Sequence, residues 1–441
     1  MALKNRLGCG WDERVGILCS MVFLVIANIP GTIALRYGLQ LVLLLLVLCY
    51  RRDAVSRLWS ESRWPAIWLV GFVGYAALHC WLIAYWPAYA WSEFRSQLVV
   101  GALWFFLGWG IYRRPNRISQ IDQLIIAGSL LALAEFLIEA WHWKQSGTWP
   151  YMVTFTTDTH LEFTFFMNIV LAFVMIALFF RQTHYIQPSR LPVWLLSAIG
   201  LLAVFVSVKV AARNGMIGLI YLGFSITVIY MVFELKRQGI RRIVALGSVV
   251  VIILCGLGAY SFKADTRNEV LLPSLQAGWN YQTSTIWLDN SEVPFLPDGR
   301  QMDDSAYKRI AWFHSGFDLI AEHPQGYGFG RDAFGLALLH KGYPHYPSTN
   351  AHSGIIDLGI RLGLPGIVLW FGYCLALVVT GLRAYSVRGE LRGLVLLLVS
   401  CGFMGRMMIE SIQRDHMLFL FLFITAGLLA EISARRDAFS T

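Results

Sequence analysis

Charged residues are scarce in this sequence. Asp, Glu, Lys and Arg make up 14% of its 441 residues, whereas a typical soluble domain contains about 25%. Hydrophobic residues make up 57%, which is more apolar surface than a fold of this length could hide from water. The composition therefore excludes an ordinary soluble enzyme and indicates a protein whose solvent is lipid.

Cysteine is absent between Lys263 and Ser353, the longest polar segment of the chain. A disulfide-stapled external domain is therefore excluded there. No CxxC pair or cluster of His and Cys with metal-ligand spacing occurs, so we predict neither a metal site nor a cofactor. The sequence also lacks a basic run with interleaved aromatic residues, so we do not expect nucleic acid as a partner.

Long apolar stretches dominate what is present. A membrane-spanning helix needs about 20 mostly apolar residues, and twelve stretches qualify. The candidate spans are residues 15–30, 33–50, 65–85, 97–112, 120–140, 161–180, 191–208, 215–233, 243–262, 364–382, 391–408 and 416–432. The sequence therefore predicts an all-α polytopic membrane protein with about twelve transmembrane helices. Helices 1–9 lie within residues 1–262, one large external loop spans 263–353, and the last three helices lie within 354–441.

The distribution of positive charge predicts the orientation. If the twelve spans alternate, 21 Lys and Arg residues fall on the side of both termini and only seven in the short connections opposite. Short cytoplasmic loops are enriched in Lys and Arg. We therefore expect both termini in the cytoplasm and the large loop outside.

An amphipathic helix is the clearest pattern inside the loop. Its apolar face consists of Ile310, Trp312, Phe313, Phe317 and Ile320. Asp304 and Ser305 offer an N-terminal cap, and His323-Pro324 ends the pattern. Arg309 lies on the first turn, where a cation opposes the helix dipole. Two interpretations remain open: a salt bridge to Asp303 or Asp304, or an anionic ligand.

Arg213 also lies where a guanidinium is costly, at the external junction of two apolar spans. It is either an interfacial anchor whose head reaches water or a functional cation. The glycine-rich segment Glu322–Gly330 contains Gly326 and Gly328, which could let the backbone approach a phosphate. It lacks the Gly-Lys-Ser/Thr of a P-loop, so a plain turn is the alternative.

Three histidines, His340, His345 and His352, occur close together. Their spacing suits no helical metal face. His352 lies where the polar loop re-enters the membrane, and an imidazole at that boundary could accept a proton from a substrate.

These segments together resemble the O-antigen ligase and polymerase superfamily. Its members carry a His that opens a span, with glycines eleven and fourteen residues later, as in His352, Gly363 and Gly366. Arg309-Ile-Ala-Trp312 and the later His-Pro-Gln-Gly-Tyr-Gly segment are similar to its Arg, Trp and "HPxxGxG" elements. Arg213-Asn-Gly215 resembles the Arg after its central external helix end.

The chain departs from the family pattern at two positions. Ser353 replaces the usual Asn after the His, and Arg361 occupies the place of an acidic residue. Asp357, on an adjacent turn, could compensate. Because a polymerase would carry two sizeable external loops and this chain has one, the ligase interpretation leads.

The resemblance implies a GT-C-like glycosyltransferase in the inner membrane of a Gram-negative bacterium, with its active site facing the periplasm. The donor would be O-antigen on undecaprenyl diphosphate, and the acceptor a sugar hydroxyl of lipid A–core. Membrane lipids would surround the chain. Transfer would invert the anomeric centre without a metal, because Arg groups in a low dielectric can stabilise the departing diphosphate.

The resemblance also assigns roles to residues. His352 would be the general base, and Arg213 and Arg309 would bind the diphosphate. Lys209 and Arg414 are further diphosphate candidates, and His340 is an alternative base. Gly326 and Gly328 would shape the substrate-binding loop.

The sequence leaves two alternative functions open. A polymerase of the same superfamily would differ only in its acceptor. A lipid-linked oligosaccharide transporter or flippase would be expected to show inverted repeats and charge at the membrane midplane. The chain shows no mirrored halves, and Glu135, Glu139 and Glu162 are nearly its only charges inside the spans.

Overall fold

The computed structural model describes most of the chain. The described residues are 11–50, 54–113, 118–150, 153–180, 189–210, 213–238 and 266–440 without 290, 291, 293 and 347, together with scattered positions between 245 and 259. Within them the fold is all-helical, and the only β feature is an isolated bridge between Phe295 and Gln301.

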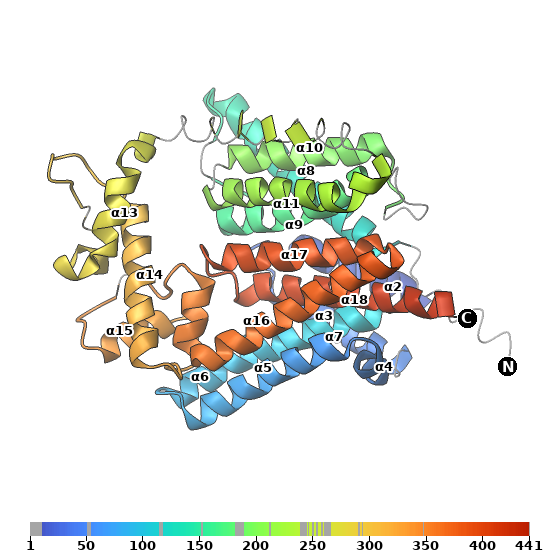
Figure 1. Ribbon diagram of the computed structural model, residues 1–441, viewed down its shortest axis with the longest axis horizontal. Coiled ribbons are helices and arrows are strands. Elements are labelled where there is room, and N and C mark those ends of the chain that lie inside the picture. The colour runs from blue at the N-terminus through green and yellow to red at the C-terminus, as the bar shows by residue number, and fades with distance from the viewer. Residues whose placement is uncertain are drawn as a thin grey trace.

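Apolar helices form the body of the molecule (Figure 1). They are α2 (Trp11–Ile26), α3 (Ile33–Tyr50), α5 (Arg63–Leu82), α6 (Pro87–Phe94) continuing through η1 (Arg95–Val99) into α7 (Val100–Tyr112), α8 (Gln120–Ser146), α9 (His160–Phe179), α10 (Val193–Lys209), α11 (Arg213–Gln238), α16 (Gly354–Arg388), α17 (Leu391–Met407) and α18 (Asp415–Ser440). The short α4 (Ala54–Glu61) joins α3 to α5. Their large buried side chains form one continuous apolar core.

Seven helices in the described part are long and apolar enough to cross a membrane. They are Arg63–Leu82, Pro87–Tyr112, Gln120–Ser146, His160–Phe179, Gly215–Phe233, Gly354–Arg388 and Asp415–Ala434. Shorter apolar helices occupy the predicted spans 33–50 and 191–208, and α2 and α17 coincide with two more. The predicted span 243–262 lies largely outside the described residues. The chain is thus a helical protein with several candidate membrane spans, and the count of twelve stays a prediction.

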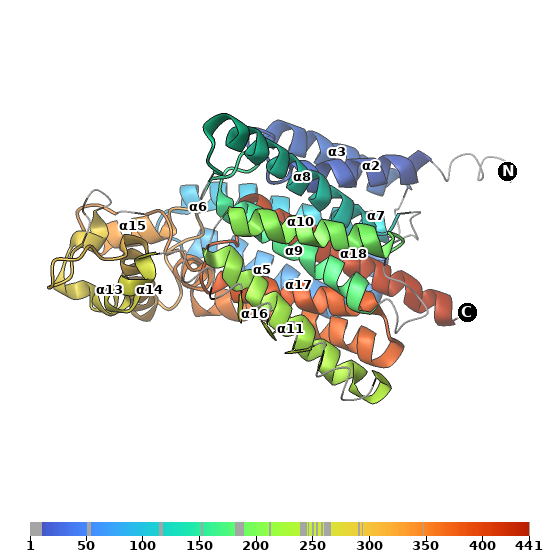
Figure 2. The ribbon, with the colours of Figure 1, turned by 90° about the horizontal axis from the view of Figure 1, so that it is seen from above.

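The segment predicted as the large loop lies at one end of the bundle. Figures 1 and 2 both place α13 (Leu271–Trp279), α14 (Asp304–Glu322) and α15 (Ala333–His340) there, whereas the start of α2 and the C-terminal end of α18 lie at the opposite end. Short 3-10 turns connect these helices: η2 (Thr266–Val270), η3 (Tyr281–Thr283) and η4 (Ile286–Leu288). This end has an apolar core of its own, built around Trp287, Trp312 and Phe334.

The amphipathic helix predicted in the loop is confirmed as α14. Its N-cap is Asp303 and not the predicted Asp304 or Ser305: the Asp303 side chain accepts a hydrogen bond from the amide of Ala306 at 3.3 Å. Asp304 pairs with Lys308 at 2.8 Å, one turn further along. Trp312 points into the core of the loop, where its indole N–H donates to the carbonyl of Trp287 at 3.1 Å. The cap and this buried anchor fix the direction of the helix.

Helix α16 begins at Gly354, ten residues before the predicted span 364–382. It is kinked at Gly363, which adopts φ 66° and ψ −170° just before Pro365. The glycine-rich segment crosses this kink. The amide of Gly328 donates to the carbonyl of Arg361 at 3.1 Å, and the amide of Leu364 donates to that of Pro324 at 2.8 Å. A backbone that leaves the helical path thus finds its partners in the loop.

Candidate active site

His352 lies on the turn that leads from the loop into α16. Its backbone φ is +52°, a left-handed conformation that residues other than glycine seldom adopt. Its imidazole stacks on the indole of Trp312, with ring centroids 5.0 Å apart and an interplanar angle of 21°. Such strain persists only where surrounding contacts enforce it, and it is common at functional sites.

Three polar side chains hold this turn. Asp357, in the first turn of α16, accepts a hydrogen bond from the amide of Ala351 at 2.7 Å and another from the hydroxyl of Ser411. Asn350 accepts from the amide of His352 at 3.1 Å and from the Ser411 hydroxyl at 3.0 Å. All three are buried. The turn between α17 and α18 therefore helps to fix the direction of the imidazole.

His352 is kept neutral by its surroundings. Burial, followed by the positive charges of Arg309 and Arg414, lowers its pKa from the usual 6.5 to about 4. A cation nearby and a partly apolar environment both disfavour the imidazolium form. At neutral pH the ring is therefore free to accept a proton.

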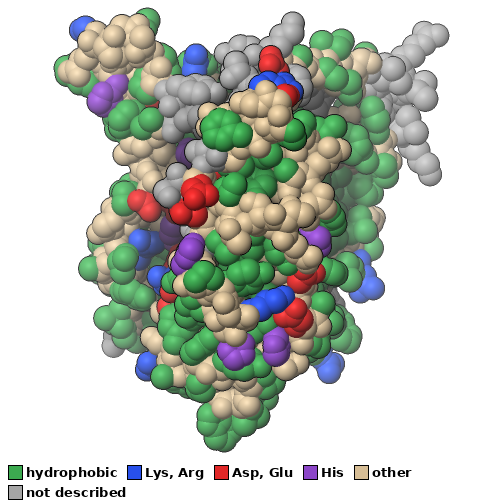
Figure 3. Space-filling model, turned by 90° about the vertical axis from the view of Figure 1, so that its left-hand side faces the viewer, with side chains coloured by type: hydrophobic (Ala, Val, Ile, Leu, Met, Phe, Trp, Pro, Cys, Tyr) green, Lys and Arg blue, Asp and Glu red, His purple; other side chains and the backbone are tan. Residues whose placement is uncertain are grey.

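Arg309 and Arg414 approach His352 from different elements. Arg309 lies on α14 in the loop, and Arg414 immediately precedes α18 in the bundle. Arg309 also acts electrostatically on His160, the first residue of α9. Figure 3, which views this end of the molecule, shows basic, acidic and histidine side chains gathered on it. The sequence separates these groups by up to about 250 residues, and the fold brings them together.

Arg406 connects this end to the interior of the bundle. On α17, its guanidinium pairs with Glu410 at 2.7 Å and donates to the carbonyl of Leu161 at 2.7 Å. Arg406 and Glu410 also act electrostatically on His160.

Arg406 also lines an apolar pocket of about 110 Å³ between α9, α11 and α17. The pocket is otherwise lined mainly by apolar residues: Phe165, Ile169, Ala172, Ile217, Leu222, Leu398, Val399 and Phe403 among them.

A second strained residue lies beside this group. Asp415 has φ +50°, and its carboxylate pairs with Arg331 of the loop at 3.0 Å. Arg331 also contacts Glu93 of α6 at 3.3 Å. These ion pairs connect α6, the loop and the start of α18, and Asp415 directly follows Arg414 in the sequence.

The structure brings together some of the predicted site residues and leaves others apart. His352, Arg309 and Arg414 are close enough to affect one another's charge. Arg213 begins α11, but its side chain lies outside the described residues. Lys209 lies over the rings of Trp149 and Phe205, at 5.7 and 5.8 Å. No contact described for Lys209 reaches His352.

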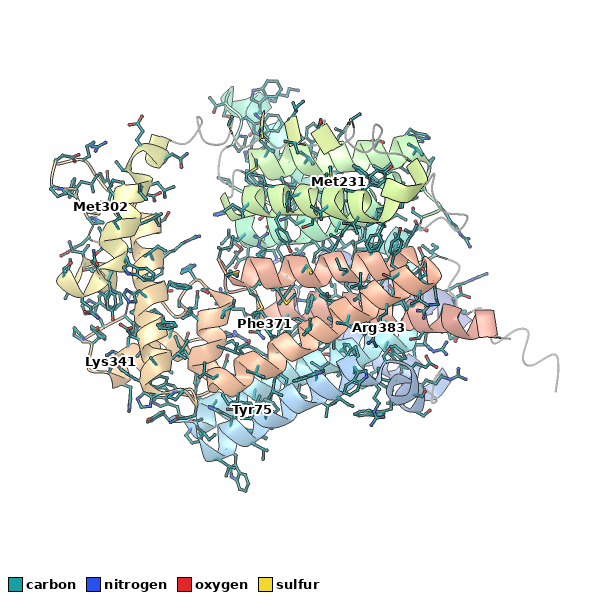
Figure 4. The ribbon with its side chains drawn as sticks, viewed as in Figure 1. Tyr75, Met231, Met302, Lys341, Phe371 and Arg383 are labelled. Carbon is teal, nitrogen blue, oxygen red and sulfur yellow. The ribbon has the colours of Figure 1, made fainter. Side chains whose placement is uncertain are left out.

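His340 is exposed at the end of α15, and its ring lies tilted against that of Tyr85, with 4.4 Å between centroids and an interplanar angle of 52°. None of its described contacts involves His352 or Arg309. On the same loop, Lys341 pairs with Glu322 at 2.6 Å (Figure 4). The described contacts of His340 are with aromatic rings and with His323, so we prefer His352 as the base, and the role of His340 stays a prediction.

Gly326 and Gly328 have packing partners in the fold. The amide of Gly326 donates to the carbonyl of His323 at 2.9 Å, and a Cβ on Gly326 would lie 2.5 Å from the amide nitrogen of Gly363. The amide of Gly328 donates to the carbonyl of Arg361, so the amides of both glycines already have hydrogen-bond partners within the protein. We therefore do not assign them to a phosphate, and their close approach to the α16 kink accounts for glycine at both positions.

Several groups were not singled out from the sequence: Asn350, Ser411, His160, Arg406 and Glu410. Of these residues, Arg406 has the clearest sequence pattern. A charge at the end of an apolar span tends to mark function, and Glu410 follows Arg406 at the i,i+4 spacing of an ion pair. Ser411 and Asn350 look like ordinary turn residues until the two turns meet in space.

No group of three or more His, Cys, Asp and Glu side chains in the described ranges is arranged to hold a metal ion. The absence of a metal from the chemistry stays a prediction that chelation can test.

Comparison with known proteins supports the family that the motifs indicate. No curated protein is similar enough to the chain to count as a match. Residues 210–371 match the family model described as O-antigen ligase. The matched range begins just before Arg213, includes α14 and the glycine-rich segment, and extends past His352 and the α16 kink. The chain therefore carries a domain of the O-antigen ligase family.

Proposed function

We propose that this protein is an O-antigen ligase, which transfers O-antigen from undecaprenyl diphosphate to a sugar hydroxyl of lipid A–core at the periplasmic face of the inner membrane. The observation that carries the proposal is the neutral imidazole of His352, stacked on Trp312 with Arg309 and Arg414 in electrostatic reach. A base next to fixed cations is what transfer from a diphosphate requires.

The chemistry can be written with these groups. The acceptor hydroxyl oxygen attacks the anomeric carbon, and the bond from that carbon to the diphosphate oxygen breaks. The electron pair leaves with the undecaprenyl diphosphate, whose added charge Arg309 and Arg414 stabilise, with Arg213 proposed as a third cation. The hydroxyl proton passes to His352. Attack opposite the leaving group inverts the anomeric centre.

Donor binding would also prepare the base. In the unliganded protein, burial lowers the pKa of His352 most, and Arg309 and Arg414 lower it further. A diphosphate bound between them offsets their charge, so the pKa of His352 rises towards neutrality and the imidazole becomes a stronger base. The base is thus weak until the donor is in place, which limits unproductive proton transfer.

The apolar pocket between α9, α11 and α17 suits the polyprenyl part of the same donor. Its lining is almost wholly apolar, and Arg406 lies at its edge, within reach of the His160 and Arg309 group. At about 110 Å³ the pocket holds only a short part of the polyprenyl chain, and that part would lie beside Arg406. Lipid A–core would then approach from the outer leaflet.

The test is transfer in vitro from a synthetic undecaprenyl-diphosphate oligosaccharide to purified lipid A–core. We expect His352→Ala to lower turnover by about 10²–10⁴-fold, the usual contribution of a general base. His345→Ala, at an exposed histidine of the same loop with no proposed role, is the matched control and should retain activity. Equal turnover in His352→Ala and the unaltered protein would remove His352 as the base.

Two further measurements separate the alternatives. EDTA should leave transfer unchanged, and loss of activity that returns with a divalent metal would contradict the metal-free mechanism. In cells lacking the protein, a ligase defect leaves long polymer on the carrier lipid. Single repeat units on the carrier would indicate the polymerase instead.

A further inference from the structure

Arg361 is a buried cation that the mechanism above does not use. It lies on α16, one turn after Asp357, and only 2% of its surface is exposed. Its Nε and Nη2 atoms are buried without a hydrogen-bond partner in the described part of the chain. The guanidinium lies over the ring of Phe329, 5.8 Å from its centroid.

The nearby acids are engaged elsewhere. Asp357 and Asp415 both act electrostatically on Arg361. Asp357 accepts hydrogen bonds from Ala351 and Ser411, and Asp415 pairs with Arg331. Among the described residues neither carboxylate forms an ion pair with Arg361. A buried guanidinium left in this way is costly, because no interaction replaces its lost hydration.

Arg414 makes the local charge more positive still. It acts on both Arg361 and His352, so the two guanidinium groups disfavour each other. Arg414 is partly exposed and directly precedes the N-terminus of α18, whose dipole favours an anion. An anion that reaches the pair from the exposed side of Arg414 would relieve both the repulsion and the unsatisfied N–H groups.

We infer that Arg361 and Arg414 form an anion-binding site beside His352 that takes a phosphate group of a substrate. Guanidinium groups match phosphate oxygens in geometry and in charge. The assignment of that phosphate to donor or acceptor rests on the proposed function. Binding of the anion itself does not, and it can be measured without any transfer.

Inorganic pyrophosphate is the probe, titrated by calorimetry into the full-length protein in lipid nanodiscs. We expect Arg361→Met to weaken its binding by about tenfold or more, the usual contribution of a charge-assisted hydrogen bond. Arg300→Met is the matched control, because Arg300 is exposed on a hairpin of the same loop and pairs only locally with Asp298. Its affinity for pyrophosphate should equal that of the unaltered protein.

The affinity decides between a ligand-binding and a purely structural Arg361. Equal pyrophosphate affinity in Arg361→Met and the unaltered protein overturns the inference. Should Arg361→Met fail to fold, Arg361→Lys takes its place, since lysine keeps the charge but loses the planar fork. Unchanged affinity in that variant is then the contradicting result. We also expect the unliganded Arg361→Met protein to melt no lower than the unaltered protein, since methionine removes an unpaired buried charge.

Kinetics identify the source of the phosphate. If it is the donor diphosphate, Arg361→Met raises KM for the donor and leaves KM for the acceptor unchanged. If it is a phosphate on the acceptor, KM for phosphorylated lipid A–core rises, whereas KM for the dephosphorylated acceptor does not. If Arg361→Met binds pyrophosphate more weakly than the unaltered protein, but the unaltered protein itself shows no measurable transfer, the result counts against the proposed function and not against the anion site.

Discussion

At the scale of single residues, the chemistry depends on whether His352 carries a proton. Its pKa of about 4 means that the ring is neutral above that pH and charged below it. Two arginines contribute to this value, so the protonation state of the base is linked to the residues proposed to bind the diphosphate. The same charges that stabilise the leaving group therefore also set the strength of the base.

This linkage predicts the pH profile. We expect kcat/KM, which reports the free enzyme, to be level near neutrality and to fall as the pH drops through about 4. Arg414→Gln removes a positive charge that opposes the imidazolium form, so the pKa of His352 rises and the acid limb moves to higher pH. Arg300→Gln should leave the limb in place. An acid limb near 6.5 in the unaltered protein would contradict the environment described for His352.

The sequence could predict His352 and Arg309 because each occupies an unusual place in a local pattern. One lies where the loop re-enters an apolar span, and the other lies near the start of an amphipathic helix, in its second turn and not in the predicted first turn. The partners that make the site work could not be found in this way. Asp357 meets Ser411 only because two turns converge, and Arg361 is recognisable as unpaired only once its neighbours are known.

At the scale of elements, the kink in α16 organises the site. Gly363 has a backbone conformation that is essentially restricted to glycine, and a Cβ there would lie 2.3 Å from the carbonyl oxygen of Pro324. Tyr75 of α5 supports the kink by donating to the carbonyl of Leu362 at 3.0 Å (Figure 4). The kink allows the first part of α16, with Asp357 and Arg361, to pack against the loop.

Gly363→Ala should therefore destabilise the protein. The strained backbone alone costs about 1–3 kcal/mol, and the clash with the glycine-rich segment adds to it, so the melting temperature in detergent should fall. Gly74→Ala is the matched control, since Gly74 lies in α5 with no atom within 4 Å of its Cβ position. An unchanged melting temperature in Gly363→Ala would show that the helix can straighten without cost.

The run of apolar residues predicts that this span begins at residue 364. The structure continues the helix back to Gly354, since Leu364 finds a hydrogen-bond partner in Pro324 of the loop. A long-range partner of this kind leaves no trace in local propensity. For α14, by contrast, the apolar face and the terminating His323-Pro324 lie within the segment. The predicted end of the helix is confirmed, whereas its N-cap is Asp303 and not Asp304 or Ser305.

At the scale of the whole molecule, the arrangement bears on orientation. The loop helices lie at one end, and the start of α2 and the C-terminal end of α18 lie at the other (Figure 1), which is the arrangement that the alternation of Lys and Arg requires. The site formed by His352, Arg309 and Arg414 lies where the loop meets the bundle. If the loop faces the periplasm, the site lies beside the leaflet in which a flipped lipid-linked donor would be found.

Cysteine labelling in intact cells can test this orientation. We would replace the native cysteines, introduce Arg300→Cys in the exposed loop hairpin or Arg388→Cys at the far end of α16, and add a membrane-impermeant maleimide. The two sites are a matched pair, because each replaces an exposed arginine, and they lie at opposite ends of the bundle. We expect Arg300→Cys to react in spheroplasts and Arg388→Cys to react only after the membrane is permeabilised, because positively charged short loops stay in the cytoplasm. The reverse pattern would place His352 on the cytoplasmic face, where the proposed acceptor and a flipped donor could not meet it.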